Sequence, residues 1–313
     1  MVLVLDGGLG TALEQRGVEL TGTDSLWSAR MLRDDPSVLE AVHRDFYEAG
    51  ANVVTTATYQ FSFKGFEELG VSHDEAAEIM RQGVAVARKA AGGVDGRKVA
   101  ASLGSFGATL ANGSEYTGNF GVDEDHLVQF HVERLKALVA DDKCLPDFIA
   151  FETLPSMQEV RAVVRTLEEC APLPENIKVW VSMSLNTEGE LNSGESFKEA
   201  MEFLRDAKLV DIAGINCTAP PAAAKALESA SQVAPEQPLV VYPNSGEAYI
   251  NRVWVPASGV TEDDFANMLS VWAKEHKQIA LLGGCCRVGV DGIAKLAKAL
   301  TVPAETSEDV TSA

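Results

Sequence analysis

The chain has 313 residues, of which 46 are Asp or Glu and 26 are Lys or Arg, so its formal net charge is −20 at pH 7. A surface this acidic repels phosphate backbones and anionic membrane surfaces, which argues against nucleic acid and membrane partners. The first ten residues, MVLVLDGGLG, hold only four apolar residues between Met1 and Asp6, too few for a signal peptide or a membrane span. We therefore expect a single-domain cytoplasmic protein, a monomer or a small homo-oligomer.

Eight short apolar runs recur along the chain, each followed by polar or Gly-rich residues and then by a segment with helical periodicity. They predict eight strands, at residues 2–5, 52–56, 98–104, 147–152, 178–185, 211–216, 238–243 and 278–283. Nearly all of these runs are continuously apolar, as expected for parallel strands that are covered on both faces. The pattern predicts an α/β fold, a (β/α)8 TIM barrel formed by residues 1–302, with an open doubly wound sheet as the alternative. The polar residues 303–313 are expected to be a disordered tail.

Helix start signals lie between the predicted strands. At four places a hydroxyl residue precedes an acid by three positions, so that the hydroxyl caps the first turn and the acid reaches back: Ser72 and Glu75, Ser156 and Glu159, Ser196 and Glu199, Thr261 and Asp264. In the helical segment 123–140, His131 shares an apolar face with Leu127, Leu135 and Leu138. We expect His131 to be a core histidine with hydrogen-bond partners, and not a metal ligand.

A barrel of this kind carries its chemistry at the carboxyl ends of its strands. The residues at those ends include most of the unusual ones in the chain, namely Asp6, Gly7, Gly8, Glu152, Asn216, Cys217, Cys285 and Cys286. Two loops that follow predicted strands, at residues 105–121 and 244–256, are long and rich in glycine. Both are candidates for a mobile cover over the site.

Three of the five cysteines lie at the ends of the sixth and eighth strands. Alternate strands of a barrel share layers of inward side chains, so Cys217 can meet Cys285 and Cys286 if the chain turns at this adjacent pair. The preceding Gly283 and Gly284 supply the freedom for that turn. Three thiolates with one open position fit a catalytic Zn²⁺ site better than a structural one, although ligand type leaves iron open. Cys144 and Cys170, at predicted helix ends, are expected to be ordinary buried residues.

The other strand ends supply groups that suit an amino-acid substrate. The segment DGGLG lacks the spacing of a full GxGxxG motif, but the glycines can present backbone N–H groups to a small carboxylate. Asp6 and Glu152 stand where an ammonium group can be paired. Amides for a carboxylate, acids for an ammonium group and a metal held by thiolates together fit an amino acid that bears a thiol.

Eight segments together resemble the zinc-dependent homocysteine S-methyltransferases: DGGLGTALEQRG, LWSARML, AGANVVTTATYQ, GSEYTGNFG, FETLPS, GINC, YPNSGEAY and GGCCR. The resemblance runs from residue 2 to about residue 300, and the combination of GINC and GGCCR is specific. It implies a (β/α)8 barrel that binds zinc through Cys217, Cys285 and Cys286. It also implies a homocysteine site in which Glu152 holds the amino group, with Asp6 nearby, the carboxylate near Gly7 and Gly8, and Asn216 among the contacts.

The implied reaction transfers a methyl group from a cationic donor to the homocysteine thiol, which zinc holds deprotonated, and yields methionine. Only 27 residues follow Cys286, too few for the C-terminal segment of betaine-using relatives or for cobalamin modules. We therefore expect S-methylmethionine or S-adenosylmethionine as donor, with betaine, or a selenol acceptor, as alternatives. The aromatic residues that could face the donor are Tyr59, Phe106, Tyr116 and Tyr249, although core packing is the commoner role.

An alternative from another class is a non-catalytic thiol protein, either a zinc store or a redox sensor. In the sensor, Cys285 and Cys286 would close a strained and therefore labile disulfide between adjacent residues. This alternative explains the cysteine pair but gives no role to Glu152, Cys217 or the DGG segment.

Overall fold

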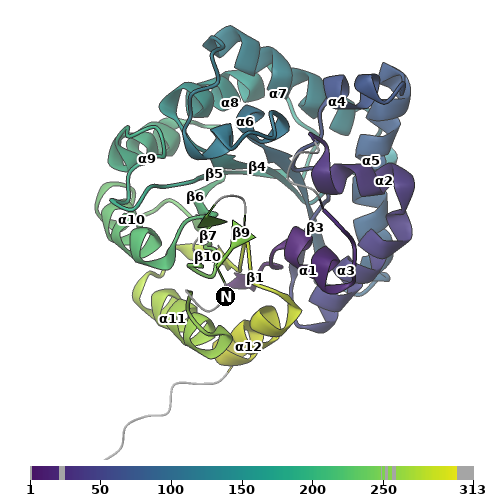
Figure 1. The fold of residues 1–313 in the computed structure, drawn as a ribbon. Coiled ribbons are helices and arrows are strands. Elements are labelled where there is room, and N and C mark those ends of the chain that lie inside the picture. The colour runs from purple at the N-terminus through teal and green to yellow at the C-terminus, as the bar shows by residue number, and fades with distance from the viewer. Residues whose placement is uncertain (1, 21–24, 248, 251–252, 256–258, 302–313) are drawn as a thin grey trace, which may run out of the picture.

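Eight parallel strands form a barrel surrounded by helices (Figure 1) in the computed structural model, which describes residues 2–20, 25–247, 249–250, 253–255 and 259–301. The strands are β1 (Leu3–Val4), β2 (Val53–Thr55), β3 (Lys98–Gly104), β4 (Phe148–Leu154), β5 (Lys178–Met183), β6 (Ile212–Asn216), β7 (Leu239–Tyr242) and β10 (Ile279–Leu282). Their order in the sheet is β1-β10-β7-β6-β5-β4-β3-β2, and every pair is parallel. All eight predicted strands are therefore present.

The barrel is closed between β1 and β2. A parallel bridge joins Leu5 to Val53, the N–H of Asp6 donates to the carbonyl of Val53 at 3.0 Å, and the N–H of Asn52 donates to the carbonyl of Val4 at 2.7 Å. Because these bonds connect the two ends of the strand order, the fold is the predicted (β/α)8 barrel and not an open doubly wound sheet.

The helices cover the outside of the barrel (Figure 1). They are α1 (Leu9–Gln15), α2 (Met31–Asp34), α3 (Pro36–Glu48), α4 (Phe63–Glu68), α5 (His73–Ala91), α6 (Phe106–Thr109), α7 (Glu124–Leu138), α8 (Met157–Cys170), α9 (Phe197–Asp206), α10 (Pro220–Val233), α11 (Glu262–Glu275) and α12 (Val290–Thr301), with short 3-10 helices η1 (Trp27–Arg30), η2 (Ser114–Tyr116) and η3 (Asp142–Cys144). Within the described ranges, no helix combines the length and apolar character that crossing a membrane requires.

The loop after β7 contains a hairpin that the sequence analysis did not predict. Its strands, β8 (Tyr249–Ile250) and β9 (Val253–Trp254), pair antiparallel and have two residues each. Strands this short leave no recognisable alternation of apolar and polar residues. The expected tail, 303–313, lies outside the described residues.

The buried apolar side chains form three separate groups: a large helix-facing layer, a small cluster between α7 and α8, and the barrel interior. The interior group is drawn from alternate residues of the strands: Leu5, Val53, Ala100, Phe148, Ala150, Trp180, Ile212, Val240, Tyr242 and Leu281. Because side chains alternate along a strand, Ser102, Glu152, Ser182 and Asn216 are inward positions nearer the carboxyl ends of their strands. The apolar filling of the barrel therefore ends below a layer of polar side chains.

The predicted hydroxyl caps are all present: the side chain of each accepts a hydrogen bond from the backbone N–H three residues on, at α5, α8, α9 and α11. The expectation that the acid reaches back to the first turn of its helix, where it would accept from the backbone N–H of the capping residue, is wrong for Glu159. Its carboxylate is fully buried and lies 3.0 Å from Nε2 of His131. The carboxylate is instead held by the buried histidine on α7 and by the backbone N–H of Phe106.

Candidate active site

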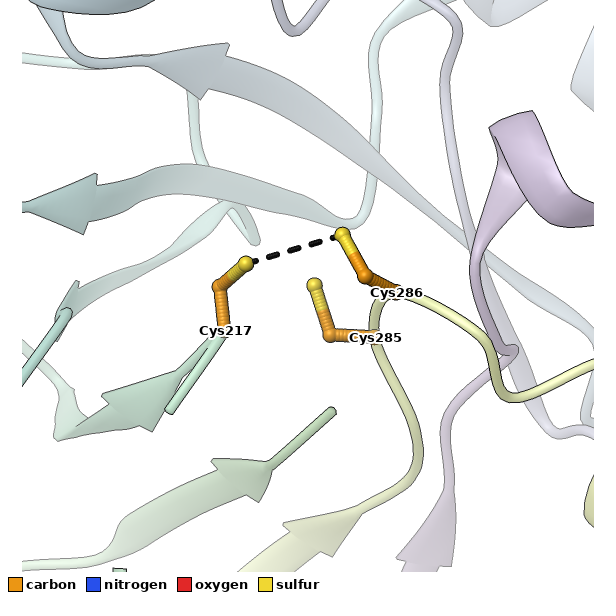
Figure 2. A group of neighbouring side chains, drawn as sticks. All are labelled: Cys217, Cys285 and Cys286. Carbon is orange, nitrogen blue, oxygen red and sulfur yellow. Dashed lines mark hydrogen bonds between the residues drawn. The ribbon is translucent and has the colours of Figure 1, made fainter. Parts of the chain in front are cut away.

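Three cysteine side chains meet at the carboxyl end of the barrel (Figure 2). Cys217 follows β6 directly, and Cys285 and Cys286 follow β10. Their three sulfur atoms lie within 4.8 Å of one another, and the Sγ atoms of Cys217 and Cys286 are 3.6 Å apart. The prediction that the cysteines of these two strands come together is confirmed.

The chain turns at both places, as the shared cluster requires. Cys217 has a positive φ of 48°, and Arg287, directly after the pair, has a φ of 66°. Left-handed backbone is strained for residues other than glycine, and it persists where the surrounding structure holds it. The turn at the pair is held by two backbone bonds, from Cys285 N–H to the carbonyl of Pro243 at 2.8 Å and from Gly284 N–H to the carbonyl of Asp6 at 3.1 Å.

The sulfur positions match the size of a tetrahedral thiolate site. Zinc–sulfur bonds of about 2.3 Å at tetrahedral angles place neighbouring sulfurs about 3.8 Å apart. The 3.6 Å separation of Cys217 and Cys286 agrees with that value, and Cys285 lies within the same limit of 4.8 Å. Hydrogen bonds from the thiols of Cys217 and Cys285 lower the pKa of Cys286 well below its usual value. These three residues can therefore hold a metal ion.

Glu152, at the end of β4, is the buried carboxylate beside this cluster. Ser102 of β3 donates to its Oε1 atom, and the hydroxyl of Tyr242 donates to Oε2 at 2.9 Å. Tyr242 in turn contacts Ser182 at 2.7 Å and accepts from the indole N–H of Trp180 at 3.2 Å. Burial raises the pKa of Glu152 to about 7. The network fixes the carboxylate but provides no positive charge, so a cation is the partner that it lacks.

Asp6, at the end of β1, is a second buried acid on the same cavity wall. The backbone N–H of Thr55 donates to its Oδ2 atom at 2.7 Å, and the Thr55 hydroxyl lies 3.1 Å from the same oxygen. Burial raises the pKa of Asp6 well above its usual value, and the nearby charge of Glu152 raises it further. Two acids that oppose each other's ionisation favour the binding of a positively charged group between them.

The two glycines of the DGG segment have a packing role. A Cβ atom on Gly7 would lie 2.3 Å from the carbonyl oxygen of Val288, and one on Gly8 would lie 2.7 Å from that of Cys285. Their lack of a side chain lets the turn that carries the cysteines pack against β1 and α1. The expectation that both glycines offer an amide to a substrate carboxylate fails for Gly8, whose N–H already donates to Val288 at 2.9 Å.

A cavity of about 550 Å³ connects these groups. The acids Asp6, Glu14, Glu115 and Glu152 line it together with the three thiols, whereas no Lys, Arg or His appears among the described lining residues. Trp27, Glu115 and Tyr242 also line the cavity, and none of the three was predicted from the sequence. Tyr242 and Ser102 carry a weak signal, because each is a polar group inside an otherwise apolar strand.

The remaining predicted residues divide between the cavity and the core. Tyr59 and Tyr116 line the cavity, and the Tyr116 hydroxyl lies 3.7 Å from the sulfur of Cys217. Phe106 is half-buried and packs edge-on against Phe120 and Phe130, next to the core cluster of α7 and α8. The side chain of Tyr249 lies outside the described residues.

Asn216, at the end of β6, also lines the cavity, with both polar atoms of its side chain engaged. Its Oδ1 atom accepts from the backbone N–H of Thr153 at 2.8 Å and from Ser182 at 2.9 Å, and its Nδ2 atom donates to the Thr153 hydroxyl at 2.7 Å. Thr153 has a positive φ of 62° directly after Glu152. Asn216 therefore holds the strained backbone next to the buried carboxylate.

The family model described as homocysteine S-methyltransferase matches residues 3–300. The chain belongs to the homocysteine S-methyltransferase family. The assignment identifies a methyltransferase, and the resemblance read from GINC and GGCCR is confirmed.

Relatives of known name and structure agree with the family. The chain is 38% identical over 307 residues to homocysteine S-methyltransferase 3 of Zea mays, covering 91% of this chain and 86% of the relative. It is 36% identical over 304 residues to a selenocysteine Se-methyltransferase of Brassica oleracea var. italica, covering 91% and 84%. The structure of the metallated form of the homocysteine methyltransferase MmuM from Escherichia coli superposes with a TM-score of 0.78 at 32% identity, covering 95% and 96%.

Membership of this family argues against the alternative of a non-catalytic zinc store or redox sensor. All five cysteines of the chain are free in this structure, Cys285 and Cys286 included. Cys144 and Cys170 lie at the ends of η3 and α8, apart from the three-thiol cluster as expected, but they are half-buried and not buried.

Proposed function

We propose that the protein catalyses zinc-dependent methyl transfer from a sulfonium donor, S-methylmethionine or S-adenosylmethionine, to the thiol of L-homocysteine, giving methionine. The observation that carries this proposal is the cluster of three thiols at the wall of a cavity that also contains the carboxylate of Glu152. Three sulfur ligands suit a soft metal ion such as zinc and leave one position for the sulfur of the substrate.

The acids of the cavity fit the amino group of homocysteine. Glu152 is fixed by Ser102 and Tyr242, so its carboxylate would receive the ammonium group without rearrangement. Asp6, held by Thr55, adds a second negative charge on the same wall. We propose that the backbone N–H of Gly7, and not that of Gly8, binds the substrate carboxylate. We also propose that Asn216 positions Glu152 through its hydrogen bonds to Thr153.

When bound to the three thiolates, zinc would keep the acceptor thiol deprotonated at neutral pH. The side chains of the cavity then have to orient the acceptor and exclude water. Glu152 and Asp6 fix the amino end, so that the sulfur end points toward the thiol cluster. The lone pair of the acceptor sulfur forms the new bond to the methyl carbon, while the old carbon–sulfur bond breaks and its electron pair stays on the donor. The donor leaves as a neutral thioether, so no general base is required at the methyl carbon.

The charge of the cavity favours a donor with a net positive charge. Four carboxylic acids and three thiols line it, and the described lining residues include no basic side chain. S-methylmethionine and S-adenosylmethionine carry a sulfonium in addition to an amino-acid zwitterion, whereas betaine has a carboxylate that balances its cation. The sulfonium donors therefore have a net positive charge and betaine has none, so the acidic wall supports the sulfonium donors over betaine.

A selenol acceptor is a second candidate, supported by the 36% identity to a selenocysteine Se-methyltransferase. Selenium has the soft-ligand character of sulfur and would take the same position beside the three thiols. We further propose that the protein works in the cytoplasm, because clustered free thiols persist in a reducing compartment.

Methionine formation from homocysteine tests the proposal directly. Purified protein loaded with zinc is supplied with S-methylmethionine, S-adenosylmethionine or betaine in parallel, with and without a chelator. We expect turnover with a sulfonium donor that the chelator abolishes. Selenocysteine replaces homocysteine in a parallel series to compare the two acceptors.

The cysteine variants complete this experiment. Cys217→Ser is expected to lose the bound zinc and at least about a hundredfold of the turnover, since one of three metal ligands is removed. Cys144→Ser, a matched change of a half-buried cysteine outside the cluster, is expected to keep both. Full zinc content and turnover in Cys217→Ser would show that the three-thiol site is not the catalytic centre.

A further inference from the structure

Glu115 is a carboxylate of the cavity wall, one oxygen of which lacks a hydrogen-bond partner among the described residues. It lies on η2, in the loop after β3, and its Oε2 atom is buried with no hydrogen-bond partner among the described residues. The two buried acids of the cavity, Asp6 and Glu152, accept hydrogen bonds: Asp6 from Thr55, and Glu152 from Ser102 and Tyr242. A buried carboxylate oxygen without a donor is costly, and such a group is expected where a ligand completes the site.

The position of Glu115 places this charge close to the thiol cluster. The adjacent Tyr116 contacts the sulfur of Cys217 at 3.7 Å, and both residues line the same cavity. Burial raises the pKa of Glu115 to about 7, with a further contribution from the negative charge of Cys217. A positive group bound between Glu115 and the thiols would be attracted to both.

The homocysteine ammonium group does not account for Glu115. Asp6 and Glu152 lie at the ends of β1 and β4 and interact with each other electrostatically, whereas Glu115 is on a separate loop. The proposed reaction brings a second cation into the cavity, the methyl donor. Its positive sulfur must come within reach of the acceptor thiol, which is the region that Glu115 and Tyr116 border.

We infer that Glu115 is the counter-ion for the positively charged sulfur of the methyl donor, an inference that rests on the proposed function. In this role Glu115 determines specificity for donors with a net positive charge. Betaine gains less from it, because the betaine carboxylate is repelled by the same acid. Glu115 was not among the residues predicted from the sequence, since a single acid in a Gly-rich loop is usually exposed to solvent.

The role makes a kinetic prediction that a structural role does not make. The positive charge of the donor disappears during the transfer, so the ion pair is strongest before reaction and weakens as the methyl group moves. An interaction of this kind lowers the KM of the donor without raising kcat. It also promotes release of the product, because the thioether left behind is neutral.

The test is the KM and kcat of Glu115→Gln with S-methylmethionine and homocysteine. We expect the donor KM to rise by about tenfold, as for loss of one charged hydrogen-bond partner, while kcat and the homocysteine KM change less than about threefold. Glu115→Asp keeps the charge and is expected to recover part of the loss. Glu188→Gln, an identical change at an exposed acid away from the cavity, is expected to behave as wild type. An unchanged donor KM in Glu115→Gln, or a drop in kcat alone, would overturn the inference.

A binding experiment separates this inference from the proposed function. Tetramethylammonium ion, a cation of similar size, is titrated onto the zinc-loaded protein by calorimetry, with uncharged tert-butanol as the comparison. We expect the wild type to bind the cation at least about fivefold more tightly than Glu115→Gln does, and tert-butanol to show no such difference. Failure of methyl transfer with a normal cation response would count against the proposed reaction alone. Equal cation binding by the two proteins would count against Glu115.

Discussion

Glu152 is a residue whose burial opposes its charge, and its effect on stability therefore depends on pH. In the unfolded chain its pKa is the ordinary 4.5, and in the folded barrel burial raises it to about 7. As pH rises from 4.5 to 7, the unfolded chain releases this proton while the folded protein keeps it, so the contribution to folding stability falls. Above pH 7 both states are ionised and the loss is complete.

Glu152→Gln is therefore expected to stabilise the fold above pH 7, by on the order of 2–3 kcal/mol in the free energy of unfolding, and to match the wild type below about pH 4.5. The same variant is expected to raise the KM of homocysteine at least tenfold, because the ammonium group loses its partner. Urea unfolding at pH 4 to 8 measures the first effect, with Glu188→Gln as the exposed control. A stability difference that stays constant with pH would contradict the argument.

The residues of the site differ in how well the sequence predicted them. Glu152 and the three cysteines lie at strand ends and are unusual there, so both their position and their chemistry indicated a functional site. Tyr242 and Ser102 carry only a weak signal as polar groups in apolar strands, and their role appears when the closed barrel turns β3, β4 and β7 toward one interior. The amide of Gly8 was assigned to a substrate because its bond to Val288 joins segments 280 residues apart, which no local pattern reveals.

At the scale of elements, a buried charged cluster fastens the loop after β3 to the helices behind it. The guanidinium of Arg134 donates to Nδ1 of His131 at 2.8 Å and to the carbonyl of Gly104 at 2.7 Å. Since Nδ1 accepts, Nε2 carries the proton and donates to Glu159, whose Oε1 atom also accepts from the backbone N–H of Phe106 at 2.6 Å. The prediction that His131 is a core histidine with partners is confirmed.

Glu159→Gln is expected to destabilise the protein by about 3 kcal/mol, because it leaves the buried guanidinium of Arg134 without its counter-charge. The donor KM should rise as well, because a neutral amide oxygen holds the backbone N–H of Phe106, at the start of the loop that carries Glu115, more weakly than the carboxylate does. Chemical unfolding and steady-state kinetics measure the two effects. Glu168→Gln, an exposed change on the same helix, serves as the control and should leave both values unchanged. Equal stabilities of the two variants would show that the cluster does not anchor the loop.

At the scale of the whole molecule, the barrel is what brings the thiols together. Cys217 and Cys286 are 69 positions apart, and β7 lies between the strands that they follow. The eight apolar runs were enough to predict this architecture, because continuous apolar strands alternating with capped helices have few other solutions. The hairpin after β7 and the position of Glu115 depend on loop packing, which the strand and helix pattern does not determine.

The proposed reaction requires that three thiols hold the zinc and leave one position for the substrate sulfur. X-ray absorption at the zinc edge counts the sulfur ligands directly, in the purified protein alone and after addition of homocysteine. We predict three sulfur neighbours at about 2.3 Å without substrate and four with it. Fewer than three sulfurs in the free protein, or a sulfur count that homocysteine leaves unchanged, would contradict the central claim.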